Sequence, residues 1–358
     1  MHDLENRPMT RVCPRRWYRL RIAMAVAMAM LMTGCASSPE AGPTEPTSKV
    51  DAGTTAPSPQ PPSTVEGPFS QVGGWIAYSS SDGIWAVDPA RPERRIRLGR
   101  ADGDPIAWSS DGTKLLIRQG APGRPTPLYV LEADGTETRL TDAYTWTGGS
   151  FSPDGSEVVF ATLSWSPSPK GSAIYAVSSN GGAPRLILRA TRRVGSSLTD
   201  VYEPALSPDG AQIAYFDGMY DHSHNLWVMN ADGTERRVLL DDEFAGAGHI
   251  RALTWSPDGE WLAFATGDEI YLVRPDGTGL RGLRPLVSDT GFALQWSPDG
   301  SQIAYIRTGA TCVSPTGKDE DFTCEAELSI VDVDGGDERI IEGIRTPEIA
   351  WIAWNPAV

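Results

Sequence analysis

Short apolar segments alternate with compact polar turns along the chain from residue 71 to residue 358. The segments are only a few residues long and rich in branched and aromatic side chains, as at 212–216 and 261–264. Runs of this kind, bounded by Gly, Pro and Asp, predict β-strands rather than helices. Residues 71–358 are therefore expected to form one large all-β domain.

One five-residue phrase punctuates this pattern: an aromatic residue or Leu, then Ser, Pro or Ser, Asp and Gly. It recurs roughly every 40 to 55 residues, in the range of one propeller blade. The complete copies have their aspartates at Asp111, Asp154, Asp209, Asp258 and Asp299. Ser, Pro, Asp and Gly in this order suit a type I turn. A later strand in each repeat leads into Asp-Gly or Asn-Gly, which is typical of a two-residue hairpin loop.

Each repeat therefore predicts a four-stranded antiparallel blade, with strands a to d and the Ser-Pro-Asp-Gly turn between a and b. Because a single meander leaves both of its faces apolar, the blades must stack around an axis. The chain ends supply a divided blade, with strands b to d at 72–100 and strand a at 349–354. Joining them removes two open sheet edges. The predicted fold is a six-bladed β-propeller, closed by a C-terminal strand that completes the first blade.

The repeat resembles that of a known family. Ser-Pro-Asp-Gly followed by Ile-Ala-Tyr, as at 213–215, and then by Ile-Tyr and Asp-Gly is similar to the propeller repeat of TolB and its relatives. The resemblance covers residues 71–358 and implies the fold. TolB also carries an α/β domain before its propeller, which serves the Tol–Pal system. That stretch has a different composition here, so the resemblance leaves a Tol–Pal role open. Similar repeats occur in prolyl oligopeptidases and oligogalacturonate lyases.

The N-terminal part has a different pattern, which predicts export. Six arginines precede or flank an uncharged apolar run at 22–32, too short to span a bilayer but suited to a signal-peptide core. The run ends in Met-Thr-Gly-Cys, which resembles a bacterial lipobox with Cys35 as the lipidated residue. An ordinary signal peptide with an incidental cysteine is the alternative. We expect residues 1–34 to be a lipoprotein signal peptide.

Residues 35–70 are rich in Pro, Thr and Ser and have little to bury, so they are expected to form a lipidated, disordered tether. The protein is then exported and held at the cell membrane or outer membrane, facing the periplasm or the cell exterior. The formal net charge of the chain is −15. Because phosphate binding requires clustered Lys and Arg, nucleic acid is not an expected partner.

The folded part contains two cysteines, Cys312 and Cys324, within a long insertion at 308–327 between strands b and c of the sixth blade. An exported protein meets an oxidising compartment, which favours a disulfide between them over two free thiols. No zinc-site spacing surrounds them. Serine hydrolysis is not expected either, because the chain has no Gly-x-Ser-x-Gly elbow and no residues left for an α/β-hydrolase domain.

Three histidines, His222, His224 and His249, are placed by the repeat in connections on one face of the ring, at blades four and five. Histidine is a common metal ligand, so a divalent-metal site is one interpretation, and solvated loop residues are the other. The same rim is expected to carry Tyr202, Glu203 and Arg251.

Insertions cluster on this face, including the one at 163–172 with Trp165, which favours it as a binding surface. The first hypothesis is a monomeric lipoprotein that binds an envelope protein or glycan and is not an enzyme, without a cofactor. The second is a metal-dependent carbohydrate-active lyase or hydrolase that uses the histidine rim.

Overall fold

The structure is a computed structural model that describes residues 68–357 apart from short gaps. The gaps are residues 81, 100–102, 121–125, 143–144, 146–147, 164–171, 192, 195–196, 220–221, 242–250, 267–268, 286–292, 314–322 and 347–350. Only the backbone is described at 193–194, 197–198, 219, 222–223, 251, 284–285, 308–313, 323–325, 342–343 and 345–346. The signal peptide, Cys35 and residues 35–67 of the tether lie outside the described residues and stay predictions.

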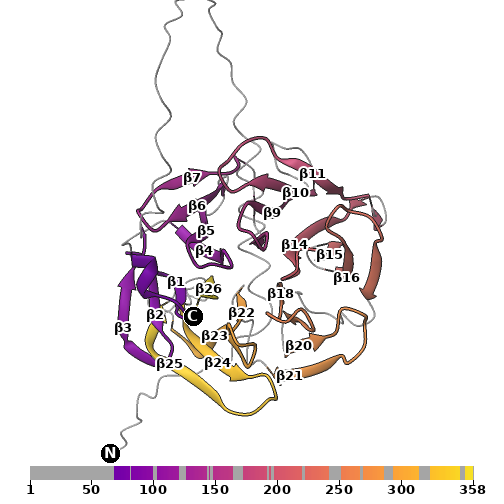
Figure 1. The fold of residues 1–358 in the computed structure, drawn as a ribbon. Coiled ribbons are helices and arrows are strands. Elements are labelled where there is room, and N and C mark those ends of the chain that lie inside the picture. The colour runs from indigo at the N-terminus through magenta and orange to yellow at the C-terminus, as the bar shows by residue number, and fades with distance from the viewer. Residues whose placement is uncertain are drawn as a thin grey trace, which may run out of the picture. The chain divides into compact units, whose positions relative to one another are not determined.

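Six four-stranded antiparallel sheets form a ring, with the first strand of each blade nearest the axis (Figure 1). Blade 1 is β26 (Ile352–Trp354), β1 (Ile76–Ser80), β2 (Gly83–Asp88) and β3 (Arg91–Arg97). Blade 2 is β4 (Gly103–Trp108), β5 (Lys114–Gln119), β6 (Leu128–Glu132) and β7 (Glu137–Arg139). Blade 3 is β8 (Gly149–Phe151), β9 (Glu157–Thr162), β10 (Ala173–Ser178) and β11 (Arg185–Arg189).

The remaining blades repeat this order. Blade 4 is β14 (Asp200–Leu206), β15 (Gln212–Met219), β16 (His222–Asn230) and β17 (Arg237–Leu240). Blade 5 is β18 (Arg251–Trp255), β19 (Leu262–Ala265), β20 (Glu269–Val273) and β21 (Arg281–Pro285). Blade 6 is β22 (Leu294–Trp296), β23 (Gln302–Val313), β24 (Thr323–Asp332) and β25 (Glu338–Thr346). A small hairpin, β12 (Arg193–Val194) and β13 (Ser197–Leu198), and a short 3-10 helix, η2 (Pro68–Gln71), complete the described elements.

The ring closes as predicted, because the last strand completes the first blade. β26 pairs antiparallel with β1, with Ala353 opposite Ala77. The indole of Trp354 donates to the carbonyl of Gly74 at 2.8 Å, and the indole of Trp108 in blade 2 donates to the carbonyl of Ala353 at 3.2 Å. The C-terminal strand is therefore bonded to both the first and the second blade.

The apolar core lies between the blades. Each of the six clusters of buried apolar side chains joins two neighbouring blades, and together they account for every interface in the ring. Phe216 of blade 4 and Phe264 of blade 5, for example, are fully buried with their ring centroids 6.2 Å apart. This arrangement confirms that the two apolar faces of each meander are buried by stacking.

The recurrent phrase builds the turn that its residue types predict. In the third blade Ser152 Oγ donates to the carboxylate of Asp154 at 2.5 Å, and the amide of Glu157 donates to Ser152 Oγ at 2.9 Å. Gly155 has φ +68°, which favours glycine. Hydrogen bonds, first from the Ser152 hydroxyl, lower the pKa of Asp154 to about 2. Ser, Asp and Gly are thus each required by the turn.

Two connections differ from the expected loops, because the strands continue into longer hairpins. Both His222 and His224 belong to β16, whose ladder with β15 extends to the pair Met219 and His222. In blade 6 the ladder between β23 and β24 continues across the insertion and places Cys312 opposite Cys324. Backbone pairing extends these strands where the side chains show no alternation of apolar and polar residues.

Candidate functional site

A channel of about 330 Å³ runs between the inner strands of the ring. Every blade contributes to its wall through β4, β8, β14, β18, β22 or β26, the strands nearest the axis in Figure 1. Several lining positions carry small or neutral polar side chains: Ala107, Ser150, Ala205, Thr254 and Gln295. These residues occupy one position of the repeat, directly before the aromatic residue or Leu, but their small size alone fits a channel wall and small-on-bulky packing between blades equally well.

Glu203 is the single ionisable residue among the described residues that line the channel. Its side chain is 7 % exposed, and Gly148 of the preceding blade lies against it. A Cβ at Gly148 would stand 2.9 Å from Glu203 Oε2, so the carboxylate occupies the space that a side chain there would need. A carboxylate held in a neutral, mostly apolar channel attracts cationic and hydrogen-bond-donating groups.

The backbone at this position is strained. Glu203 has φ +50° at a bulge of β14, where pairing with β15 is interrupted between Tyr202 and Ala205. Ala252 repeats the feature in blade 5, with φ +58° at the bulge of β18. Left-handed backbone is costly for residues other than glycine and persists only where the surrounding structure determines it. Blades 4 and 5 therefore both present strained inner strands to the channel.

Tyr202 and His224 form a separate pair beside Glu203. The Tyr202 hydroxyl is hydrogen-bonded to His224 Nδ1, and its ring packs on Phe216 with centroids 5.5 Å apart. His224 is 3 % exposed, so it is not a solvated loop side chain. Tyr202 packs against the apolar cluster between blades 4 and 5, whereas Glu203 lines the channel. Tyr202 and Glu203 are thus adjacent in sequence, but the first belongs to the interface between blades 4 and 5 and the second to the wall of the channel.

The structure does not describe the side chains of the other predicted site residues. His222 and Arg251 lie in β16 and β18 with only their backbone described, and His249 and Trp165 lie outside the described residues. Within the described part of the chain, no three His, Cys, Asp or Glu side chains are grouped to hold a metal ion. The metal-dependent interpretation therefore gains no support from the geometry.

A second polar feature flanks the channel at blades 1 and 2. Arg118 pairs with Asp104 at 2.6 Å, and its guanidinium carbon lies 4.7 Å from the ring centroid of Trp351, which lines the channel. The side chain of Asp104 is 29 % exposed and that of Arg118 is 15 % exposed. The sequence pattern does not reveal this cluster, because Trp351 lies far along the chain from the paired strands β4 and β5 that carry Asp104 and Arg118.

Comparison with known proteins supports the fold. No protein-family model matches the chain. An uncharacterized protein of Agrobacterium fabrum is 28 % identical over 64 % of this chain and 72 % of its own length. A TolB homolog of Chlorobium luteolum is 30 % identical over 51 % of this chain, but the match spans only 37 % of that protein.

Among solved structures, TolB from Acinetobacter baumannii is similar with a TM-score of 0.60 and 18 % identity, over 81 % of this chain and 67 % of that one. A structure from Agrobacterium tumefaciens described as TolB has a TM-score of 0.53 and 21 % identity, over 75 % of this chain and 87 % of that one. No helix in the described part of the chain is long and apolar enough to cross a membrane. With the six stacked blades and the closing strand, these likenesses show that the chain is a six-bladed β-propeller with the TolB-like fold.

Proposed function

We propose that this chain is an exported, lipid-anchored envelope protein whose propeller binds a protein or glycan partner at the mouth of its central channel. The observation that carries the proposal is Glu203, a buried carboxylate on strained backbone and the one ionisable group among the described lining residues. Strained backbone is retained at sites whose geometry is used. A TolB-like propeller, matched by a TolB homolog, favours an envelope role.

The channel chemistry suits a partner that presents hydrogen-bond donors. An amine, a guanidinium or a sugar hydroxyl entering the mouth at blade 4 meets Glu203. Charge-assisted hydrogen bonds to a carboxylate gain strength in a site shielded from water. Small lining side chains leave room for a narrow segment or a single sugar rather than a globular surface.

We place the insertion with the cysteine pair on the same face of the ring as the channel mouth beside Glu203. Register places Cys312 directly opposite Cys324 in the ladder of β23 and β24. Directly opposed residues of an antiparallel pair have Cα atoms about 4.5 to 5.5 Å apart, within the range that a disulfide bridges. We include this disulfide in the proposal as a brace that holds the long hairpin in one conformation beside the channel.

Face-specific photo-crosslinking in the native envelope tests the proposal. A photoreactive residue replaces Asp104, beside the channel mouth, in one variant and Asp232, in the turn between β16 and β17, in another. The proposal expects a discrete crosslinked adduct from position 104 and none from position 232. Adding Glu203→Gln should weaken the adduct from 104. Equal adducts from both positions, or an adduct indifferent to Glu203→Gln, would contradict binding at the channel.

A further inference from the structure

The bulge that carries Glu203 has a cause in the sequence. Pro204 comes directly after Glu203 and has no N–H group to donate to β15. Pairing of β14 with β15 is interrupted at this point, between Tyr202 and Ala205. The proline accounts for the gap in the ladder but not for φ +50° at Glu203, because a residue before proline favours extended backbone. Other contacts must therefore hold Glu203 in the left-handed conformation.

Both neighbouring blades hold the residues that follow the bulge. The indole of Trp255 in blade 5 donates to the carbonyl of Ala205 at 2.9 Å. From the other side, the amide of Leu206 donates to the hydroxyl of Ser150 in blade 3, also at 2.9 Å. The strand is thus fixed at its return to the ladder, directly after Glu203 and the proline.

A contact within blade 4 holds the residue before the bulge. The hydroxyl of Tyr202 is hydrogen-bonded to His224 Nδ1, and the two rings meet edge to face with centroids 5.9 Å apart. Tyr202 pairs with Phe216 of β15 and also packs on its ring, whereas His224 belongs to β16. The bond therefore joins the first strand of the blade to the third, across β15. Glu203 is held between two fixed segments of β14.

The equivalent bulge in blade 5 is held differently. Ala252 has φ +58° there, but Leu253 follows it in place of a proline and Arg251 precedes it in place of a tyrosine. The indole N–H of Trp296, which corresponds to Trp255 one blade further on, is buried without a hydrogen-bond partner among the described residues. Within the described strands, the bulge of blade 5 therefore has neither the indole bond nor the tyrosine found at the bulge with the carboxylate.

We propose that Tyr202 and His224 are positioning residues for the channel site, because the hydrogen bond between them keeps the Glu203 carboxylate beside Gly148 in the channel. Strained backbone persists only where its surroundings determine it. Without the bond, Tyr202 is no longer tied to β16, and Glu203 relaxes toward extended backbone and withdraws from Gly148. The inference rests on the proposed function, and it assigns neither residue a contact with the ligand.

Solution NMR of the full chain in detergent tests this inference without any ligand. The amide resonance of Gly148 is the probe, because Glu203 Oε2 lies against this glycine. Glu203→Gln removes the charge there and should shift the resonance in the otherwise unchanged protein. In the Tyr202→Phe background we expect the same substitution to give at most about half of that shift, since the loss of one hydrogen bond changes a conformational equilibrium roughly fivefold.

Two further backgrounds separate positioning from general stability. His224→Asn keeps an amide that can bond the Tyr202 hydroxyl and should preserve the shift, whereas His224→Leu should lose it as Tyr202→Phe does. Tyr305→Phe is the matched control, because it removes a buried tyrosine hydroxyl that donates to Glu338 in blade 6. This control should leave the Gly148 shift unchanged. Thermal melts check that every variant folds.

Three outcomes overturn the inference. They are a full Gly148 shift in both Tyr202→Phe and His224→Leu, an equal loss in Tyr305→Phe, or a loss in His224→Asn as large as that in His224→Leu. Crosslinking from position 104 tests the proposed function separately. Absence of that adduct in the unchanged protein would contradict binding at the channel and leave the NMR result on Glu203 standing.

Discussion

Glu203 and Ala252 hold left-handed backbone at equivalent bulges of two neighbouring inner strands. A bulge changes the direction in which a side chain of its strand points. At Glu203 the bulge directs a carboxylate into the channel, whereas regular alternation along the strand would direct it toward an interface between blades. Sequence pattern does not reveal this, because a bulge depends on the register between two strands and leaves the residue types unchanged.

Replacing Ala252 by Gly isolates the strain, because both Ala252 and Ala265 are 5 % exposed and lie in strands of blade 5. Ala265→Gly should lower the free energy of unfolding by about 1 to 2 kcal/mol, from a lost buried methyl and added backbone entropy. Ala252→Gly loses the same methyl but relieves a left-handed alanine, worth about 1 kcal/mol. Urea unfolding should show the smaller loss for Ala252→Gly. Equal losses would mean that the positive φ carries no strain.

The turn aspartates make the stability of the ring depend on pH. Asp154, Asp209 and Asp299 each have a pKa lowered first by a hydrogen bond from the turn serine. A lowered pKa in the folded state gives stability that is present above the ordinary value of 3.8 and is lost as pH falls through the folded value. For Asp154 that window runs from 3.8 down to about 2.

Asp154→Ala should therefore flatten the decline of the free energy of unfolding between pH about 4 and about 2, because one linked proton is removed. Ser152→Ala, which removes the donor to Asp154, should flatten it similarly. Urea titrations across this pH range measure both slopes. Slopes equal to that of the wild type in both variants would show that this turn contributes nothing to the acid sensitivity.

Among the elements, strands and turns that carry the repeat could be predicted closely, because each is specified by local residue types. β5, β9 and β19 begin just after their Ser-Pro-Asp-Gly or Ser-Ser-Asp-Gly turns, as the turn chemistry requires. The hairpin extensions at β16 and β23 could not be predicted, because residues such as His222 and Ser223 do not form a pattern typical of a strand. Their pairing depends on continuing a ladder whose register is set further down the strand.

The long hairpin of β23 and β24 leads to a prediction about its two cysteines. If Cys312 and Cys324 are joined as their register allows, non-reducing mass spectrometry of exported protein should show neither thiol open to alkylation. A bridge closing this loop should add up to about 3 kcal/mol to the free energy of unfolding. Cys312→Ser should lower the melting temperature, and reductant should then have no further effect. Two alkylated thiols in untreated exported protein would exclude the bridge.

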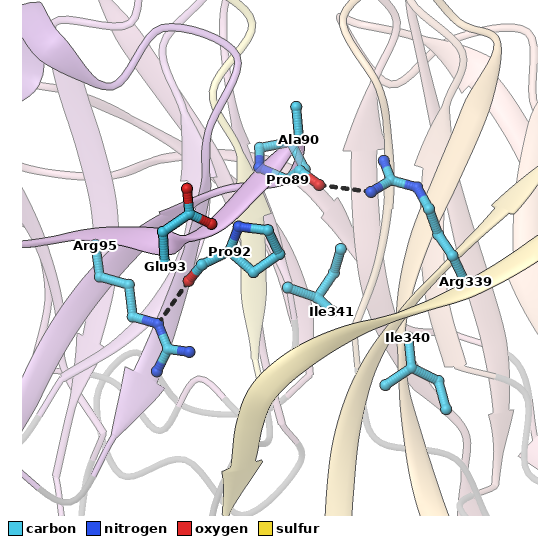
Figure 2. Close-up of a pocket in the computed structure, with 8 residues that line it drawn as sticks. All are labelled: Pro89, Ala90, Pro92, Glu93, Arg95, Arg339, Ile340 and Ile341. Atoms are coloured by element: carbon cyan, nitrogen blue, oxygen red, sulfur yellow. Dashed lines mark hydrogen bonds between the residues drawn. The ribbon is translucent and has the colours of Figure 1, made fainter.

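At the scale of the molecule, the ring follows from the number of repeats and the divided blade. Six interfaces bury the apolar faces of six meanders, and the C-terminal strand, which pairs with β1, contributes Ile352 and Trp354 to the interface between blades 6 and 1. Where the ring closes, the turn of blade 1 at Pro89 and Ala90 meets Arg339 of β25 (Figure 2). A repeat count predicts that a seam exists but not which side chains meet across it.

Closure of the ring by β26 is the claim on which the proposed channel site depends, and deletion of residues 349–358 tests it most directly. The deletion removes the pairing with β1, the Trp354 and Trp108 hydrogen bonds and one wall of the channel. A matched permutant carries residues 347–358 and a flexible linker in front of residue 68. We expect the permutant to unfold cooperatively in urea and the deletion to yield no soluble, cooperatively folding protein. A deletion variant that unfolds as cooperatively as the full chain would contradict the closed ring.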